Sequence, residues 1–218
     1  MKLNQFALGA VMVGVMGSTH AYVVDGGFES LVLTGGNFGN LLENYGPAAP
    51  AGASWTNSSN FVLGIDTTYT EGVLNFVAQQ GTKSLDLTGA GYQGAVALSQ
   101  TLALSAGQYM LSFYLGDIDG GDSRYNLPSS VEVLFAGVSV GTFTNSDGGA
   151  TTNWKKFELP FTSDGINNLL TFSTANLNLD SYTGLDNVTV TAVAEPGSLA
   201  MVLAALGAAG LAAKRRKA

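Results

Sequence analysis

The chain has 218 residues, a formal net charge of −7, no cysteine and one histidine, His20. This inventory excludes disulfides, Cys–His and Ser–His–Asp catalysis and the usual zinc ligand sets in the domain that follows His20. The acidic balance also argues against nucleic acid as a partner, because the phosphate backbone carries the same sign of charge.

The N-terminus has the pattern of a secretory signal peptide. Lys2 precedes an uncharged, largely apolar run from Phe6 to Gly17, and Thr19-His20-Ala21 is a small-x-small cleavage site. We therefore expect residues 1–21 to direct export through Sec-type machinery and to be removed after Ala21. The alternative is that residues 6–17 form a buried core helix.

Residues 22–193 form one predicted domain, which is long enough to bury a single core. The domain has 15 acidic and four basic residues, a net charge of −11, because Lys2 and the C-terminal cluster hold the other basic residues. Such a charge keeps an exported domain soluble or prepares it to bind divalent cations.

In this domain, apolar and polar residues alternate with the period of β-strands. The alternation predicts strands over residues 96–104 and 108–115, joined as a hairpin by a short turn. Residues 130–135 and 138–143 flank Ala136-Gly137 and predict a second hairpin.

Further strands are predicted after this hairpin, and no helical periodicity occurs between the two ends of the chain. The additional strands cover residues 154–161, 169–173 and 185–193. Many short strands predict an all-β fold, a two-sheet antiparallel β-sandwich of the jelly-roll type. We expect a signal-peptide helix before this sandwich and an apolar helix after it.

Four motifs in the domain occur in the order found in a known fold family. They are Asp25-Gly26-Gly27-Phe28-Glu29, Gly81-Thr82-Lys83-Ser84-Leu85, the pair Gln100-Thr101-Leu102 with Gly107-Gln108-Tyr109-Met110-Leu111-Ser112-Phe113, and Leu185-Asp186-Asn187-Val188. Together they resemble jelly-roll carbohydrate-binding modules and galactose-binding-like domains. The first motif resembles an opening strand of that family, with Asp25 in place of the usual Asn. The resemblance concerns the fold and does not establish sugar binding.

This resemblance implies a structural calcium ion that joins the first strand to the last. The matching ligands are the side chains of Glu29 and Asp186, with the backbone carbonyls of Gly27 and Lys83. Calcium takes six to eight oxygen ligands, and carboxylates and carbonyls supply them. The alternative is that Glu29 and Asp186 accept hydrogen bonds from backbone amides at strand ends.

The densest acidic stretch predicts a ligand-binding loop. Its candidate residues are Asp117, Asp119, Asp122, Arg124 and Tyr125. Carboxylates, an Arg and a Tyr together can bind sugar hydroxyls and ring faces. The stretch lacks the later ligands of an EF-hand, and a solvated loop with Asp and Gly as turn formers is the alternative.

Sugar platforms also need exposed aromatic rings. We expect Trp55 to cover the core rather than stack on a sugar, and Trp154 shares a strand face with Lys156 and Glu158. Tyrosines in loop-like stretches are freer candidates. They are Tyr45, Tyr69, Tyr92 and Tyr125.

The C-terminus has the pattern of a sorting signal. A short motif precedes an uncharged apolar run over residues 199–213, and a basic cluster follows it. The motif residues are Glu195, Pro196, Gly197 and Ser198, and the basic residues are Lys214, Arg215, Arg216 and Lys217. An apolar segment with a cationic end can enter a bilayer and stop there, because charges are costly in hydrocarbon.

Residues 194–218 resemble the sorting signal of PEP-CTERM proteins, although Ala194 stands where the first Pro of that pattern belongs. The resemblance implies cleavage by an exosortase-type membrane protease. It also implies transient anchoring in the inner membrane, then a place at the cell surface or in an extracellular matrix of exopolysaccharide, as in biofilms.

Three functions remain compatible with the sequence. The first is an exported module that binds carbohydrate or associates with exopolysaccharide, and the second is a structural or adhesive surface protein without a sugar ligand. A glycoside hydrolase would need only two carboxylates, but no pair stands out among the acidic residues. We therefore expect a protein that is not an enzyme.

Overall fold

The computed structural model describes residues 22–33, 35–40, 54–57, 62–88, 96–121, 125–174 and 181–193. Several predictions concern residues outside these ranges. They are the cleavage site at Ala21, the candidate tyrosines Tyr45 and Tyr92, the loop residues Asp122 and Arg124, the motif Glu195 to Ser198, the basic cluster Lys214 to Lys217 and both flanking helices. Within the described ranges, no helix is long and apolar enough to span a membrane.

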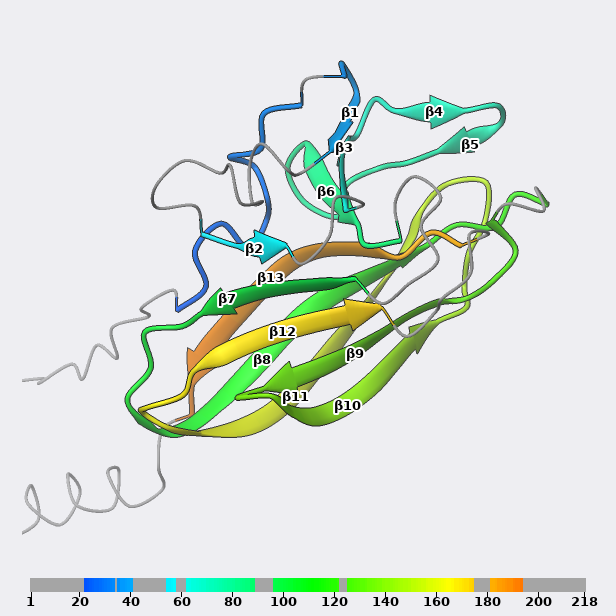
Figure 1. Cartoon of the computed structure of the whole chain (residues 1–218). Coiled ribbons are helices and arrows are strands. Elements are labelled where there is room, and N and C mark those ends of the chain that lie inside the picture. Colours follow the sequence, from blue (N-terminus) through cyan, green and yellow to red (C-terminus); the bar gives the residue numbers. More distant parts are fainter. Residues whose placement is uncertain are drawn as a thin grey trace, which may run out of the picture.

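The larger sheet has six antiparallel strands (Figure 1). In spatial order these are β1 (Phe38–Asn40), β3 (Leu63–Asp66), β6 (Lys83–Asp86), β13 (Gly184–Ala192), β8 (Ala106–Asp117) and β11 (Asn153–Asp164). Strands β8 and β11 pair without interruption over twelve residues. This pair forms the long axis of the molecule.

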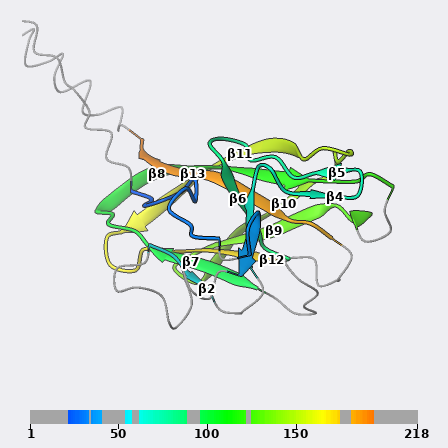
Figure 2. The same ribbon diagram turned by 90° about the horizontal axis from the view of Figure 1, so that it is seen from above.

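The smaller main sheet has five antiparallel strands and packs against the first as a second layer (Figure 2). In spatial order these are β10 (Val138–Asn145), β9 (Ser129–Phe135), β12 (Leu169–Thr174), β7 (Ala97–Thr101) and β2 (Thr56–Asn57). A separate ribbon pairs β4 (Thr70–Glu71) with β5 (Leu74–Asn75). The predicted all-β antiparallel sandwich is confirmed.

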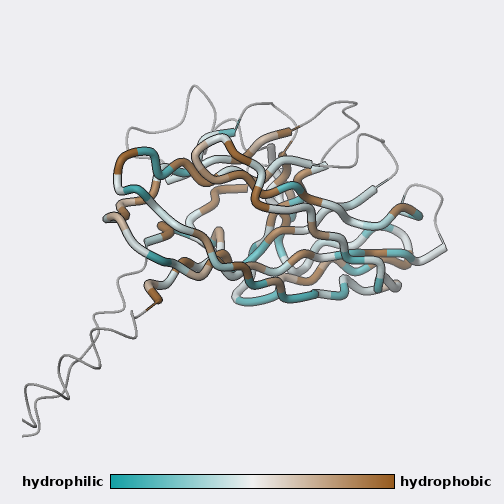
Figure 3. The backbone as a smooth tube through the Cα atoms, turned by 90° about the horizontal axis from the view of Figure 1, so that it is seen from below, coloured by the Kyte–Doolittle hydropathy of each residue, from teal (hydrophilic) through white to brown (hydrophobic). Residues whose placement is uncertain are grey.

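Alternating side chains from both sheets fill the space between the layers. On β8, Tyr109, Leu111, Phe113 and Leu115 are buried, and the residues between them are more exposed. The same alternation of burial runs along β9 and along the second half of β11. Figure 3 shows hydrophobic and hydrophilic residues interspersed along the backbone. Phe113 lies at the centre of the core, where its ring meets Phe172 of the opposite sheet at 5.2 Å.

The first predicted hairpin is wrong, and the second is confirmed. Strands β7 and β8 lie in different sheets, because residues 102–105 carry the chain from one layer to the other. Strands β9 and β10 pair as predicted around Ala136-Gly137. Both turn residues have positive φ, 55° and 80°, which is the backbone of a tight hairpin turn.

The motif at residues 25–29 does not form the expected opening strand. Asp25 and Phe28 have φ values of 53° and 57°, and the segment makes turns. The Asp25 carboxylate accepts hydrogen bonds from the backbone N–H and the hydroxyl of Ser30, which stabilises the turn. Phe28 is fully buried and packs against Trp55.

Candidate functional site

One segment lies outside the two layers, on the outer face of the six-stranded sheet. This segment, residues 67–80, contains the β4–β5 ribbon, and we call it the flap. Asn75 donates its N–H to the carbonyl of Ala150 at 2.8 Å and accepts from the N–H of Thr152 at 3.0 Å. The Trp154 indole donates to the carbonyl of Val77 at 2.9 Å. These bonds hold the flap against the sheet.

A second small core lies beneath the flap, separate from the main one. Its buried side chains are Ile65, Leu74, Phe76, Ile118 and Tyr182. They face the outer side of the six-stranded sheet, opposite to the core residue Leu85. Burial of these apolar side chains stabilises the flap independently of the sandwich interior.

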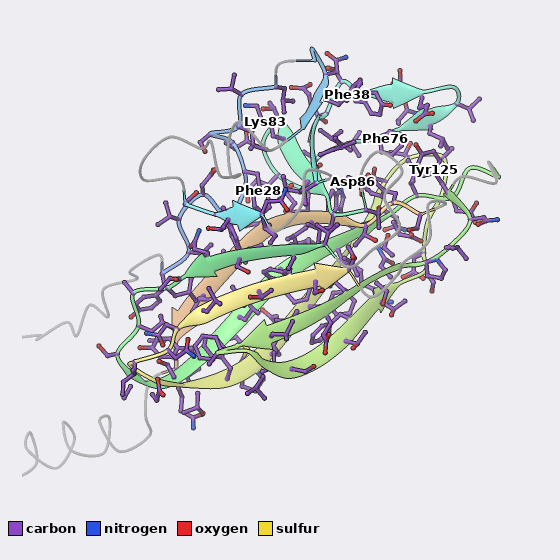
Figure 4. All side chains as sticks on the ribbon, viewed as in Figure 1. Phe28, Phe38, Phe76, Lys83, Asp86 and Tyr125 are labelled. Carbon is purple, nitrogen blue, oxygen red and sulfur yellow. The ribbon has the colours of Figure 1, made fainter. Side chains whose placement is uncertain are left out.

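Four aromatic rings form a row across this core. The ring centroids of Phe38 and Tyr69 are 5.2 Å apart, those of Tyr69 and Phe76 are 5.1 Å apart, and those of Phe76 and Tyr125 are 5.6 Å apart. Figure 4 shows Phe38, Phe76 and Tyr125 at the same end of the molecule. Phe38 is 43% exposed, whereas Phe76 is buried. The row therefore connects the surface to the small core.

A carboxylate lies against this row of rings. Glu71, on β4, accepts hydrogen bonds from the hydroxyls of Tyr125 at 2.6 Å and Tyr69 at 3.2 Å. Burial raises the pKa of Tyr125, and so does the Glu71 carboxylate, which means that this phenol keeps its proton. Tyr69, Glu71 and Tyr125 are all partly exposed. The arrangement presents aromatic faces and a fixed negative group at one surface.

A second carboxylate lies deeper in the same region. Asp86, at the end of β6, is buried and accepts hydrogen bonds from the N–H of Thr88 at 2.9 Å, the Thr88 hydroxyl at 2.7 Å and the N–H of Thr183 at 3.2 Å. Its charge also contributes to the raised pKa of Tyr125, after burial and Glu71. Asp86 fixes the loops beneath the aromatic row.

The acidic loop predicted from the sequence is divided between two roles. Asp117 is buried and accepts from the N–H and hydroxyl of Ser129 and from the N–H of Gly148, so it joins two loops. Burial raises the pKa of this carboxyl. Asp119 is exposed and accepts from the N–H of Gly121, as a turn former does. Among the described residues of this loop, only Tyr125 joins the aromatic row.

The residues of the predicted calcium site lie together but hold a loop by hydrogen bonds. Glu29 accepts from the N–H groups of Thr82 and Lys83, at 2.9 and 3.0 Å, and from the Thr82 hydroxyl. A side chain at Gly81 would collide with the Glu29 carboxylate, because its Cβ would lie 2.2 Å from an oxygen. The Lys83 ammonium donates to the Glu29 carbonyl at 2.9 Å.

Asp186 holds the neighbouring part of the same loop. Its carboxylate accepts from the N–H groups of Gln79 at 2.9 Å, Gln80 at 3.1 Å and Asn187 at 2.6 Å. Burial raises the pKa of Asp186 to about 7, and the Glu29 charge adds to this effect. The amide-bound alternative is therefore the one that the contacts show. These residues do not fit a calcium site, because backbone amides and the Thr82 hydroxyl already donate to the two carboxylates.

No larger acidic group replaces this site in the part of the chain that the structure describes. Those residues contain no cluster of three or more His, Cys, Asp or Glu side chains that could hold a metal ion. Gly27, the fourth predicted ligand, is partly buried beside Phe28.

The overall fold is shared with solved structures of low sequence identity. A cyclase from Fischerella sp. TAU is 18% identical, with a TM-score of 0.54 over 81% of this chain and 98% of that chain. The same type of cyclase in complex with 4-(1H-indol-3-yl)butan-2-one is 16% identical, with a TM-score of 0.51 over 78% and 96%. The shared feature is the β-sandwich. The carbohydrate-binding module TmCBM61 with β-1,4-galactotriose is 13% identical, with a TM-score of 0.49 over 80% and 100%.

The chain matches no protein-family model and no curated protein. The assignment of a function therefore depends on the residues and their arrangement.

Sequence reasoning found part of the site and missed the rest. Tyr69 and Tyr125 were candidates because they lie in loop-like stretches, and Trp55 covers the core as predicted, with 1% exposure. Glu71, Asp86 and Phe38 were missed. The Thr70-Glu71-Gly72-Val73 turn was the available signal for Glu71, since a short turn between polar residues predicts a ribbon.

Proposed function

We propose that the protein is an exported cell-surface or extracellular-matrix protein that binds carbohydrate at one end of a jelly-roll sandwich. Sec-type export and cleavage by an exosortase-type protease are part of this proposal, and exopolysaccharide is the proposed partner. The sequence supports the export steps through its two terminal patterns. The contacts of the aromatic row support the binding step.

The observation that carries the binding proposal is the row from Phe38 to Tyr125 with Glu71 against it. Aromatic faces pack against the apolar C–H faces of sugar rings, and carboxylates accept bonds from their hydroxyls. Phe38 supplies an exposed face, and Glu71 is already fixed by two phenols. A ligand therefore finds a preorganised surface.

The position of this surface also suits a large extracellular ligand. We call this end the loop end, and it comprises residues 66–80, 117–121, 125–129 and 145–153. Gly184 of β13 pairs with Gly116 near this end, and the strand then runs to Ala192 at the opposite end (Figure 1). The binding surface thus lies far from the point where the chain continues toward its sorting signal.

We further propose that the site binds without catalysis. A glycosidase needs an exposed acid with a raised pKa beside a second carboxylate. Two described carboxyls have a raised pKa, Asp117 and Asp186, and both are buried and accept bonds from backbone amides. Neither can reach a glycosidic bond from that position.

One observation favours the alternative of a structural surface protein. The outer face of the five-stranded sheet carries hydroxyl pairs, Ser99 with Thr171 at 2.9 Å and Ser130 with Thr144 at 3.1 Å. The described residues of these five strands place no aromatic side chain on that face. Such a face is hydrated rather than shaped for a sugar ring, as a structural surface would be.

Calorimetry of the purified protein with a panel of bacterial exopolysaccharides and oligosaccharides tests the proposal. Phe38→Ala removes the exposed face and should weaken binding about tenfold, which corresponds to roughly 1.4 kcal/mol. Val73→Ala is the matched control, because Val73 is 73% exposed on the flap and makes no part of the row. Its affinity should equal that of the wild type.

An absence of binding across the panel would favour the structural alternative. Binding that Phe38→Ala leaves unchanged would instead reject the aromatic row as the site, because the sugar would then lie elsewhere on the protein.

A further inference from the structure

The end opposite the loop end has a different surface. It comprises residues 101–107, 135–140, 161–169 and 191–193, and we call it the apolar end. Five of the nine large hydrophobic residues that are exposed in the described structure lie in these segments. They are Val138, Val140, Ile166, Leu169 and Val193, and Ile166 is 89% exposed. Exposed apolar residues that gather in this way mark an interaction surface.

Two of these side chains, Val138 and Val140, border a recess between the facing edges of the two sheets. The recess has a volume of about 450 Å³, and Pro160 and Phe161 also line it, together with polar side chains at its rim. Strands β10 and β11 are the edge strands here, and neither has a further strand beside it in the described part of the chain. The apolar surface therefore continues inward between the layers.

Both described ends of the domain emerge at this same end. Val193 donates its N–H to Gln108 at 2.9 Å, and Gln108 pairs with Thr162, which lines the recess. Two strand spacings, about 10 Å, therefore separate Val193 from the recess. At the other terminus, the Tyr22 ring packs edge-on against Tyr109 at 5.3 Å.

The length of the following chain limits how far this end can lie from a membrane. The apolar run starts at Leu199, six residues after Val193. Six residues span at most about 22 Å when fully extended. If residues 199–213 enter a bilayer, the apolar end lies within that distance of the lipid surface.

Charge also favours an approach by this end. The four segments of the apolar end contain one charged residue, Asp164. The segments of the loop end contain five carboxylates and no basic residue. Anionic lipids repel a domain of net charge −11, and this repulsion is smallest where the acidic groups are farthest away.

We propose that the apolar end is a lipid-contacting surface, on which Val138, Val140, Ile166 and Leu169 enter the headgroup region while the sorting signal is in the membrane. This inference depends on the membrane-tail part of the proposed function. It adds that the folded domain itself contacts the bilayer, with its sugar site facing away. Apolar side chains at an interface bind in proportion to the area that they bury.

The test uses the full chain in vesicles of phosphatidylethanolamine and phosphatidylglycerol. The chain has no cysteine, so Thr162→Cys supplies a single site for an environment-sensitive fluorophore beside the recess. Thr70→Cys supplies a reference site on the flap. We expect a quencher carried on the lipid chains to reduce the emission at residue 162 several-fold more than at residue 70.

A second pair of variants separates insertion from simple tethering. Val138→Ser with Ile166→Ser, made in the Thr162→Cys chain, removes the apolar contact but leaves the tail intact. Val32→Ser with Val73→Ser is the matched control, because both residues are similarly exposed elsewhere. Quenching should fall to the reference level in the first pair and stay unchanged in the second. Quenching that persists in the first pair would overturn the proposal, since tethering alone would then explain it.

Three further outcomes would also overturn it. If the chain floats with vesicles but residue 162 is not quenched, the lipid contact fails while the membrane tail stands. If the chain does not float with vesicles, the membrane-tail part of the proposed function fails together with this inference. If the quenching at residue 162 disappears when each vesicle carries one chain, the apolar end contacts a second copy of the chain instead of lipid.

Discussion

The two ends of the sandwich are built by the same strands but differ in almost every other respect. At the loop end, the flap adds a second core, a row of rings and acidic side chains. At the apolar end, short turns connect the strands, and hydrophobic side chains stay exposed. The difference shows that the two sheets give both ends the same scaffold. The loops and turns at each end determine whether its surface is polar or apolar.

The two ends also differ in how their stability is supplied. The flap has its own buried cluster, in which Phe76 meets the rings of Tyr69, Tyr125 and Tyr182. The turns of the apolar end border the main core directly, through Phe135 and Phe161. We therefore expect the loop end to respond to mutation and pH as a local unit.

The largest effect should follow Phe76→Ala. The loss of a buried aromatic side chain costs about 3 to 4 kcal/mol, and here the cost falls on the flap because the main core is separate. Hydrogen exchange should show faster exchange of flap amides with little change in β8. Phe172→Ala is the control, since it should accelerate exchange in both regions. Equal acceleration in both regions by Phe76→Ala would show that the two cores form one unit.

A pH effect of intermediate size should arise at the base of the loop end. The folded-state pKa of Asp186 is about 7, which is above its value in the unfolded chain. Between these two pH values, the folded state holds a proton on this carboxyl that the unfolded state has lost. The resulting stability is full at low pH and is lost as the pH rises through 7. The free energy of unfolding should fall by on the order of 2 kcal/mol from pH 5.5 to 8.

Urea unfolding across this pH range, in the presence of a chelator, measures the effect. Asp186→Asn should make the profile nearly flat. Asp164→Asn at the apolar end should leave the slope as it is, because backbone N–H groups of Ile166 and Asn167 lower the pKa of Asp164 and move its titration below this range. Burial also raises the pKa of Asp117, so this carboxyl is the remaining candidate for a slope of the same sign. If the free energy of unfolding still falls with pH in the Asp186→Asn variant, the pH dependence arises from Asp117 instead.

A smaller difference should separate two tyrosine hydroxyls, one at each end. Tyr125→Phe removes a bond to a carboxylate at 2.6 Å, and Tyr109→Phe removes a bond to the Ser105 carbonyl at 3.0 Å. Bonds to charged groups contribute more, so we expect losses of about 1.5 and about 0.7 kcal/mol. Urea denaturation gives both values. The reverse order would mean that Glu71 is better solvated than its contacts indicate.

The sequence was sufficient to predict the sandwich because its strands alternate with a period of two residues. Ala136-Gly137 located the β9–β10 hairpin, since few backbones suit such a short turn. The supposed hairpin of β7 and β8 failed because alternation reveals a strand but not its partner. The bulge at Asn187 was equally hidden, although it lets Leu185 and Val188 face the same core.

The candidate site was only partly predictable because its residues meet through long-range contacts. Tyr125 reaches Glu71 across 54 positions in the chain, and no local pattern records that distance. Asp86 follows Leu85, which faces the main core, and its bond to Thr183 spans 97 positions in the chain. The carboxylates at positions 29 and 186 were found through motif order, but their amide partners were not.

The smallest effect should come from calcium. Glu29 and Asp186 already accept bonds from the backbone amides of residues 79–83 and from Asn187, and an ion at this place would have to replace those bonds. We expect the melting temperature to change by less than about 1 °C with calcium or chelator, since 1 kcal/mol corresponds to roughly 2 to 4 °C in a domain of this size. Differential scanning calorimetry measures this change. A clear rise with calcium that Asp186→Asn abolishes would restore the metal site implied by the motifs, and it would make the loop end the metal-dependent end of the molecule.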